Sequence, residues 1–262
     1  MKVIKPIRPI EKQILYIPFG ILLPLYAITG YHFLEFMKIT YYGHSCFSVV
    51  AGGKTLLFDP FITGNALAKD IDVESIAADY ILVSHGHFDH MLDAVSIAKR
   101  TGAKVIGVWE LYDHFTKQGI SNSHPLNPGG QCTFDFGTLR SVTAQHSSSF
   151  SDGSYAGVAT GFIVKTTEGN FYYSGDTALT LDMTLIPKWA KLDFAVFPIG
   201  DDLTMGTEDA IEAAKMVGVD QVIGVHYDTF GFIQIDKPAS AQKFAQAGIK
   251  LHLPGIGETF VL

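Results

Sequence analysis

The sequence predicts an α/β fold with layered, mixed β-sheets, and three observations support this class. The chain has 262 residues, so it is long enough to bury roughly three quarters of its unfolded surface. Hydrophobic residues make up 47% and charged residues 17%, which excludes an intrinsically disordered chain. From Met37 onward, an early run of short apolar segments is followed by alternating apolar and amphipathic segments. This order favours layered mixed sheets over a simple doubly wound sheet.

Strands are predicted where short apolar or β-branched runs are bounded by turn residues. Gly52 and Gly53 mark a hairpin between the second strand and the third. The run Tyr80–Ser84 is almost wholly apolar, as expected of a strand buried on both faces of a sheet. The other expected strands are Lys38–Tyr42, Cys46–Ala51, Lys54–Asp59, Lys104–Val108, Gln131–Phe136, Leu139–Thr143, Ala159–Lys165, Asn170–Ser174, Leu192–Phe197, Gln221–Val225, Lys250–His252 and Thr259–Val261.

Helices are predicted where apolar residues recur at helical spacing and a glycine follows. Thr207 is expected to be the N-cap of one of them. The expected helices, each with the glycine that ends it, are Asp93–Thr101 with Gly102, Glu208–Val217 with Gly218, and Pro238–Ala247 with Gly248.

Residues 1–36 differ from the rest of the chain. Basic residues precede an apolar run from Ile14 to Ile28, which two prolines and a glycine interrupt. This run is shorter than the roughly 20 residues of a membrane-spanning helix, and the cleavage pattern of a signal peptide is poor. Two interpretations of residues 1–36 stay open. Either they form a membrane-associating extension, or the start of the protein is misassigned and translation begins at Met37. We therefore expect an extension over 1–36 and one domain over 37–262, cytoplasmic unless the extension brings it to a membrane.

The strongest chemical signal is the run His85-Gly86-His87-Phe88-Asp89-His90, directly after a buried strand. In an extended loop His85 and His87 lie on one side, so both imidazoles can reach a single ion. Asp89 and His90 can then face a second ion. A solvated polar loop with incidental histidines explains neither the spacing nor the strand that precedes it.

This run resembles the signature of the metallo-β-lactamase superfamily, whose further ligand positions also occur here in order. Each follows a predicted strand: Gln145-His146-Ser147, Ser174-Gly175-Asp176-Thr177 and Val225-His226-Tyr227. The segments Gly43-His44-Ser45 and Asp59-Pro60 are similar to those of a branch of small single-domain hydrolases that includes L-ascorbate-6-phosphate lactonase.

The resemblance implies an αββα four-layer sandwich, in which two mixed β-sheets are flanked by helices. It also implies a dinuclear metal site whose ions share a hydroxide that attacks an ester, lactone or phosphodiester bond. Zinc is the first expectation for the two divalent ions, with manganese or iron as alternatives, because imidazole and carboxylate ligands suit all three. The ligands implied are His85, His87 and His146 for one ion and Asp89, His90 and His226 for the other, with Asp176 bridging.

Other residues have expected roles around this site. Asp89 and His44 are assigned to catalysis. His44 either binds substrate or protonates a leaving group, or it hydrogen-bonds a ligand carboxylate. Asp59 is expected to orient a ligand histidine rather than to bind metal itself. Cys46 is expected to be a buried, inert thiol. The histidines without partners at ligand spacing are His114, His124 and His252.

The formal charge of −7, without a basic cluster beside the motif, weighs against a nucleic-acid partner. A small-molecule substrate is expected, and the sequence leaves open whether the chain forms a homo-oligomer. Two alternatives to a hydrolase stay open. An iron-dependent redox enzyme of the same superfamily would have an appended flavin or thiol-transfer domain, for which no spare sequence exists. A non-catalytic metal-binding protein fits poorly with the intact ligand set.

Overall fold

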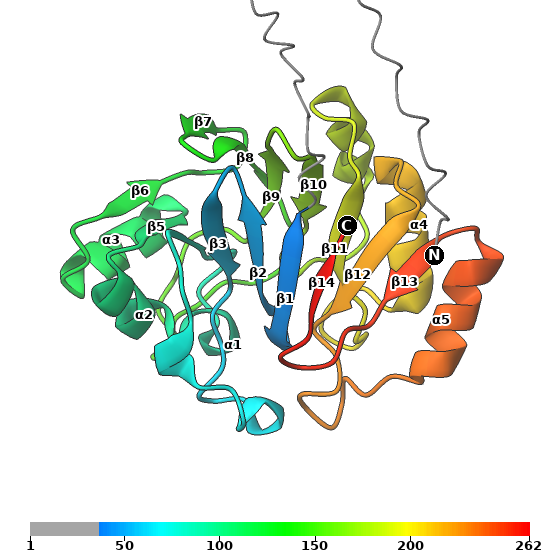
Figure 1. The fold of residues 1–262 in the computed structure, drawn as a ribbon, viewed down its shortest axis with the longest axis horizontal. Coiled ribbons are helices and arrows are strands. Elements are labelled where there is room, and N and C mark those ends of the chain that lie inside the picture. The colour runs from blue at the N-terminus through cyan, green and yellow to red at the C-terminus, as the bar shows by residue number, and fades with distance from the viewer. Residues whose placement is uncertain (1–36) are drawn as a thin grey trace, which may run out of the picture. The chain divides into compact units, whose positions relative to one another are not determined.

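Two mixed β-sheets form the centre of residues 37–262, the part of the chain that the computed structural model describes (Figure 1). The extension expected over residues 1–36 lies outside the described residues. The first sheet has the order β14-β1-β2-β3-β4-β5-β6, and the second has the order β13-β12-β11-β10-β9-β8-β7.

The strands agree closely with the predicted ones, and both sheets have the same plan. In each sheet the earlier strands, β1 to β3 and β7 to β10, pair antiparallel with the next strand. The later strands, β3 to β6 and β10 to β13, pair parallel through longer crossovers. The strands of the first sheet are β1 Lys38–Gly43, β2 Cys46–Ala51, β3 Lys54–Phe58, β4 Tyr80–Leu82, β5 Lys104–Gly107, β6 Ser123–Pro125 and β14 Thr259–Val261. The strands of the second are β7 Gln131–Phe134, β8 Gly137–Thr143, β9 Thr160–Lys165, β10 Asn170–Tyr173, β11 Phe194–Pro198, β12 Gln221–Val225 and β13 Lys250–His252.

Helices cover the outer face of each sheet, with α2 and α3 on the left in Figure 1 and α4 and α5 on the right. Short 3₁₀ helices η1 Ala66–Ala68, η2 Val73–Ser75 and η3 Leu181–Lys188 lie in the connections. The α-helices are α1 Phe88–Met91, α2 Ala94–Thr101, α3 Trp109–Lys117, α4 Thr207–Val217 and α5 Lys237–Gln246.

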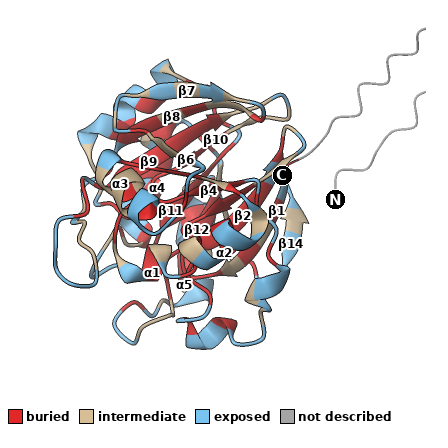
Figure 2. Ribbon diagram, turned by 90° about the vertical axis from the view of Figure 1, so that its left-hand side faces the viewer, coloured by how far each residue is buried: buried red, intermediate tan, exposed pale blue. Residues whose placement is uncertain are grey.

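Three clusters of buried apolar side chains hold these four layers together. Because side chains alternate between the two faces of a strand, neighbouring residues of one strand belong to different clusters. In β10, Phe171 and Tyr173 face the first sheet, whereas Tyr172 points outward to the cluster that contains α4. In β3, Phe58 likewise faces the second sheet and Leu57 faces α2 and α3. Figure 2 shows the central strands β9, β10 and β11 buried along most of their length. The predicted αββα sandwich is confirmed.

Two features differ from the sequence prediction. Thr207 is not the N-cap of α4: Gly206 takes that position, and the Thr207 hydroxyl instead lies 2.9 Å from the Ser240 hydroxyl of α5. Helix α3 and strand β6 were not predicted. In α3 only Leu111 and Phe115 are buried, so its helical pattern is weak in the sequence.

Within residues 37–262, no helix has the length and apolar character required to cross a membrane.

Replacing Phe58 with alanine tests the core between the sheets. Its ring stacks on Phe47 at 4.6 Å and meets the ring of Phe171 edge-on at 5.8 Å. We expect Phe58→Ala to lower the free energy of unfolding by about 3–5 kcal/mol, because a buried ring is lost and a cavity remains. Chemical denaturation measures this. The exposed control Leu181→Ala should change it by less than about 0.5 kcal/mol, and equal effects of the two substitutions would refute the assignment.

The two cysteines should react at different rates with a thiol reagent. Cys46 is fully buried, and burial raises the pKa of its thiol, whereas Cys132 is partly exposed. Because the thiolate is the reacting form, we expect one rapidly titrating thiol in the folded protein and two after denaturation. Rapid reaction of both thiols in the folded state would show that Cys46 is accessible.

Candidate metal centre

The structure brings all seven predicted ligands together where strands of both sheets end. His85 follows β4 of the first sheet, whereas His146, Asp176 and His226 follow β8, β10 and β12 of the second. The loop that leaves β4 turns into the short helix α1, which carries Asp89 and His90. The sheets thus meet at one end, where each contributes side chains to the cluster.

One group consists of His85, His87 and His146, whose ligand atoms lie within 4.8 Å of one another. The Nε2 atom of His85 lies 2.9 Å from the Nδ1 atom of His87. His85 is buried, and the other two imidazoles are half-buried. Their nitrogens converge as those of a three-histidine metal site do.

The Asp176 carboxylate lies between this group and a second one. Its Oδ2 atom is 2.9 Å from Nε2 of His226 and 3.1 Å from Nε2 of His90. The same oxygen is 3.7 Å from Nε2 of His146 and 4.0 Å from Nε2 of His85. One carboxylate oxygen therefore faces four imidazoles from both groups.

Asp89 completes the second group. Its Oδ2 atom lies 3.8 Å from Nε2 of His90 and 3.9 Å from Nε2 of His226. Burial acts to raise the pKa of the Asp89 carboxyl, but the hydrogen bond with His44 and the proximity of His90 outweigh it and lower this pKa.

The residues present fit divalent cations. Nε2 of His90 and Oδ1 of Asp176 are buried and have no hydrogen-bond partner among the described residues. A buried polar atom without a partner costs about 1–3 kcal/mol, which coordination to a cation would offset. Burial, followed by the proximity of His90, holds the pKa of His85 well below its usual value, and this keeps its imidazole neutral as a ligand must be.

Asp59 holds His90 in place, in agreement with the sequence prediction. Its Oδ2 atom accepts hydrogen bonds from Nδ1 of His90 at 2.8 Å and from the Tyr173 hydroxyl at 2.6 Å. The Ser84 hydroxyl donates to the same atom at 2.6 Å, and the Ser84 amide donates to Oδ1 at 2.7 Å. With its oxygens so engaged, Asp59 turns Nε2 of His90 towards Asp176 rather than acting as a ligand.

His44 has a possible ligand atom within 4.8 Å of those of Asp89, His90 and His226, the residues of the second group, and it contacts the Asp89 carboxylate. The Nε2 atom of His44 lies 3.0 Å from Oδ2 of Asp89, and its Nδ1 atom lies 3.0 Å from the Thr229 hydroxyl. The side chain is buried, and burial together with His226 lowers its pKa to about 4. His44 thus contacts a carboxylate of the cluster, which is one of the roles expected for it from the sequence.

The backbone is strained at the same residues. His44, Asp59 and His226 all have left-handed conformations, with φ of 53°, 41° and 56°. Such conformations cost roughly 1–3 kcal/mol each in non-glycine residues and gather at functional sites. The chain therefore makes sharp turns at three strand ends in order to present these side chains.

Sequence reasoning did not find Thr229 or Tyr173. Tyr173 belongs to an apolar strand and Thr229 to an irregular loop, so neither has a signal in the sequence pattern. His114, His124 and His252 belong to none of the groups of candidate ligands.

A cavity of about 580 Å³ gives access to the cluster. Asp89, Asp176 and His226 lie on its wall with His87 and His146. Around them are the apolar side chains of Phe88, Phe150, Leu203, Phe230 and Phe232. A cavity of this size accommodates a small organic molecule.

Comparison with known proteins agrees with this geometry. Residues 38–226 match the family described as a beta-lactamase superfamily domain. A UPF0173 metal-dependent hydrolase of Flavobacterium johnsoniae is 48% identical over 226 residues, which are 86% of this chain and 100% of the relative. A UPF0173 metal-dependent hydrolase of Christiangramia forsetii is 49% identical over 227 residues, with the same coverage.

Among solved structures, Igni18, a metallo hydrolase from the archaeon Ignicoccus hospitalis, is similar to this chain. It shares 33% sequence identity with a TM-score of 0.79, covering 87% of this chain and 99% of Igni18. With the fold, the ligand cluster and these relatives in agreement, the chain belongs to the metallo-β-lactamase superfamily and is a metal-dependent hydrolase related to the UPF0173 proteins.

Proposed function

We propose that this hydrolase holds two divalent metal ions and cleaves an ester, lactone or phosphodiester bond of a small molecule. The observation that carries the proposal is the position of the Asp176 carboxylate among four imidazoles, two from each group. Zinc is the first candidate and manganese or iron the alternatives, because the ligand types suit all three. When bound, two such ions lower the pKa of coordinated water towards neutrality and polarise the bond under attack.

In this proposal each ion is held by its own set of side chains. His85, His87 and His146 hold one ion, and Asp89, His90 and His226 hold the other. Asp176 is shared between them. Its carboxyl stays ionised, because His226 and His90 lower its pKa well below the usual value despite the opposing effect of burial.

We assign separate roles to Asp89 and His44, the two residues expected from the sequence to take part in catalysis. Asp89 lies on the cavity wall, where it can contact substrate as well as hold an ion. His44 has a pKa of about 4, so it is neutral near pH 7 and unsuited to donate a proton as an imidazolium. We propose that His44, fixed by Thr229, positions the Asp89 carboxylate.

Removal of the shared carboxylate tests the dinuclear site. We expect the wild-type protein to bind two equivalents of zinc or manganese and Asp176→Ala to bind less than one, with hydrolysis reduced at least a hundredfold. Metal analysis and a panel of lactones, phosphodiesters and acyl esters provide the two measurements. The control is Glu212→Ala, an exposed carboxylate on α4, which should retain both properties.

Two outcomes would contradict the proposal. Full activity of Asp176→Ala would exclude the shared carboxylate from the chemistry. Iron at high occupancy in protein purified without added metal, with no turnover of any panel member, would favour the redox alternative.

Replacing Asp59 with asparagine tests the support beneath His90. An amide places an N–H₂ group where one carboxylate oxygen accepts hydrogen bonds, so the orientation of His90 is no longer fixed. We expect Asp59→Asn to weaken metal binding by about 10- to 100-fold, as measured by competition with a chelator. Asp79→Asn alters an exposed carboxylate that bonds the Thr55 amide and should leave metal affinity unchanged. Equal affinity of Asp59→Asn and wild type would show that Asp59 does not support the site.

A further inference from the structure

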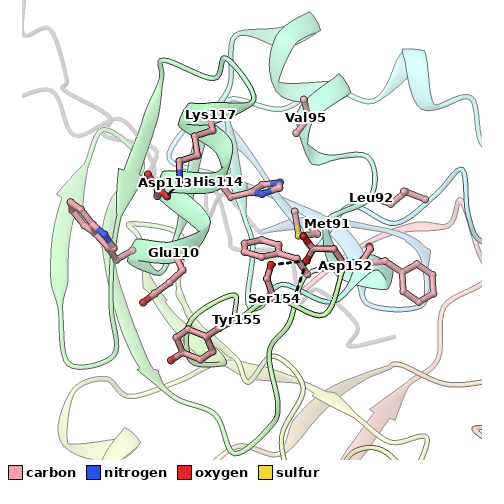
Figure 3. Close-up of a pocket in the computed structure, with 14 residues that line it drawn as sticks. Met91, Leu92, Val95, Glu110, Asp113, His114, Lys117, Asp152, Ser154 and Tyr155 are labelled. Atoms are coloured by element: carbon pink, nitrogen blue, oxygen red, sulfur yellow. Dashed lines mark hydrogen bonds and ion pairs between the residues drawn. The ribbon is translucent and has the colours of Figure 1, made fainter.

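A second cavity, of about 710 Å³, adjoins the cavity of the metal centre (Figure 3). Figure 3 shows Met91, Leu92 and Val95 from the α1–α2 region facing α3 across this space, with Tyr155 from the turn at residues 150–155 on a third side. We refer to this space as the side groove. Phe88, Phe150 and Ser151 line both cavities, so the side groove continues from the metal centre.

The side groove exposes large apolar side chains to solvent. Phe88 is 49% exposed, Leu92 47%, Trp109 58% and Tyr155 65%. They are contributed by three separate segments of the chain, yet they line one cavity. Apolar side chains that gather at a concave surface, rather than being scattered singly, are typical of a binding site.

The charges on the wall of the side groove disfavour a negatively charged ligand there. Among residues 37–262, neither Lys nor Arg lines the cavity of the metal centre. On the wall of the side groove, Lys117 is the one Lys or Arg side chain that the described residues contribute, and its Nζ atom lies 2.5 Å from Asp113. Glu110 and Asp152 add negative charge to that wall. A substrate with a phosphate group would find no guanidinium or free ammonium along this path.

We propose that the side groove binds the apolar chain of an uncharged ester or lactone whose acyl carbon lies at the metal centre. The inference rests on the proposed function and selects carboxylic esters over phosphodiesters. Water adds to the acyl carbon, the acyl C–O bond breaks, and the alcohol departs with a proton from that water. No oxidant or second substrate is required.

The position of Phe88 supports the connection between the two cavities. It directly follows His87 in the chain, and its ring meets Phe61 edge-on at 5.6 Å and Phe230 at 6.5 Å. On the other side, Phe150 stacks on His114 of α3 at 4.4 Å. Phe88 and Phe150 each line both cavities, so apolar side chains border the junction between the metal centre and the side groove.

Hydrolysis of p-nitrophenyl esters with acyl chains of two to ten carbons by the metal-loaded enzyme tests the proposal. We expect kcat/KM to rise about three- to fourfold per added methylene until the groove is full, because each methylene leaves water. Leu92→Asp should lower kcat/KM for the decanoate at least tenfold and flatten the series. Leu181→Asp, the same substitution at a more exposed leucine (79%, against 47% for Leu92) outside both cavities, should reproduce the wild-type series.

Binding measurements separate this inference from the proposed function. By calorimetry, the neutral and non-hydrolysable N-decylacetamide should bind at least tenfold more tightly than N-butylacetamide, and Leu92→Asp should abolish the difference. If no ester, lactone or phosphodiester is turned over, the proposed function fails, whereas the amides still decide whether the groove binds apolar chains.

Three results would overturn the inference. One is equal binding of the two amides. Another is faster turnover of bis-p-nitrophenyl phosphate than of the decanoate ester. The third is a dimer in solution that Leu92→Asp dissociates, with no dependence on chain length, which would assign the groove to a second copy of the chain.

Discussion

The buried carboxylate of Asp59 is the interaction on which the rest of the site depends. It accepts hydrogen bonds from the amide and hydroxyl of Ser84, from His90 and from Tyr173. Ser84 follows β4 of the first sheet, His90 belongs to α1, and Tyr173 ends β10 of the second sheet. One side chain therefore fixes the relative positions of two sheets and a ligand. Burial and the charge of Asp59 also raise the pKa of the Tyr173 phenol well above its usual value, which keeps it a hydrogen-bond donor.

The apolar layers and the polar cluster depend on each other. Phe58 and Tyr173 pack together between the sheets at 5.6 Å, immediately below the cluster, and this packing holds their strand ends at a defined separation. The left-handed turns at His44, Asp59 and His226 need such support, since isolated turns of this kind are unfavourable. A rigid scaffold thus holds strained strand ends so that nitrogen and oxygen atoms converge.

Most of the fold and the cluster of candidate ligands could be predicted from the sequence, because each segment that carries them comes within a few residues after a predicted strand. The layered class followed from the order of strands and helices. The Gly206 cap was not predicted, because Thr207 is the better capping residue by type and its hydroxyl is engaged by Ser240 only in the folded chain. The contacts of Tyr173 and Thr229 depend on how sheets and loops dock, which local patterns do not encode.

The side groove illustrates the same limit. Trp109 is 58% exposed on a concave wall, which no pattern in the sequence indicates. Three chain segments must come together before that wall exists. The residue types in the sequence therefore indicate a class of reaction. The class of substrate is indicated only by how the side chains are arranged in the folded chain.

The order of the ligands along the chain has a consequence for biosynthesis. The candidate ligands span the chain from His85 to His226. His226 follows β12, one of the last strands to be synthesised. While β12 is still inside the ribosome, the nascent chain has already exposed His85, His87 and His146 but not His226. Such long-range contacts form slowly, since much of the chain must be ordered before they close. Assembly of the complete candidate metal site is thus a late event, one that marks completion of folding rather than guiding its start.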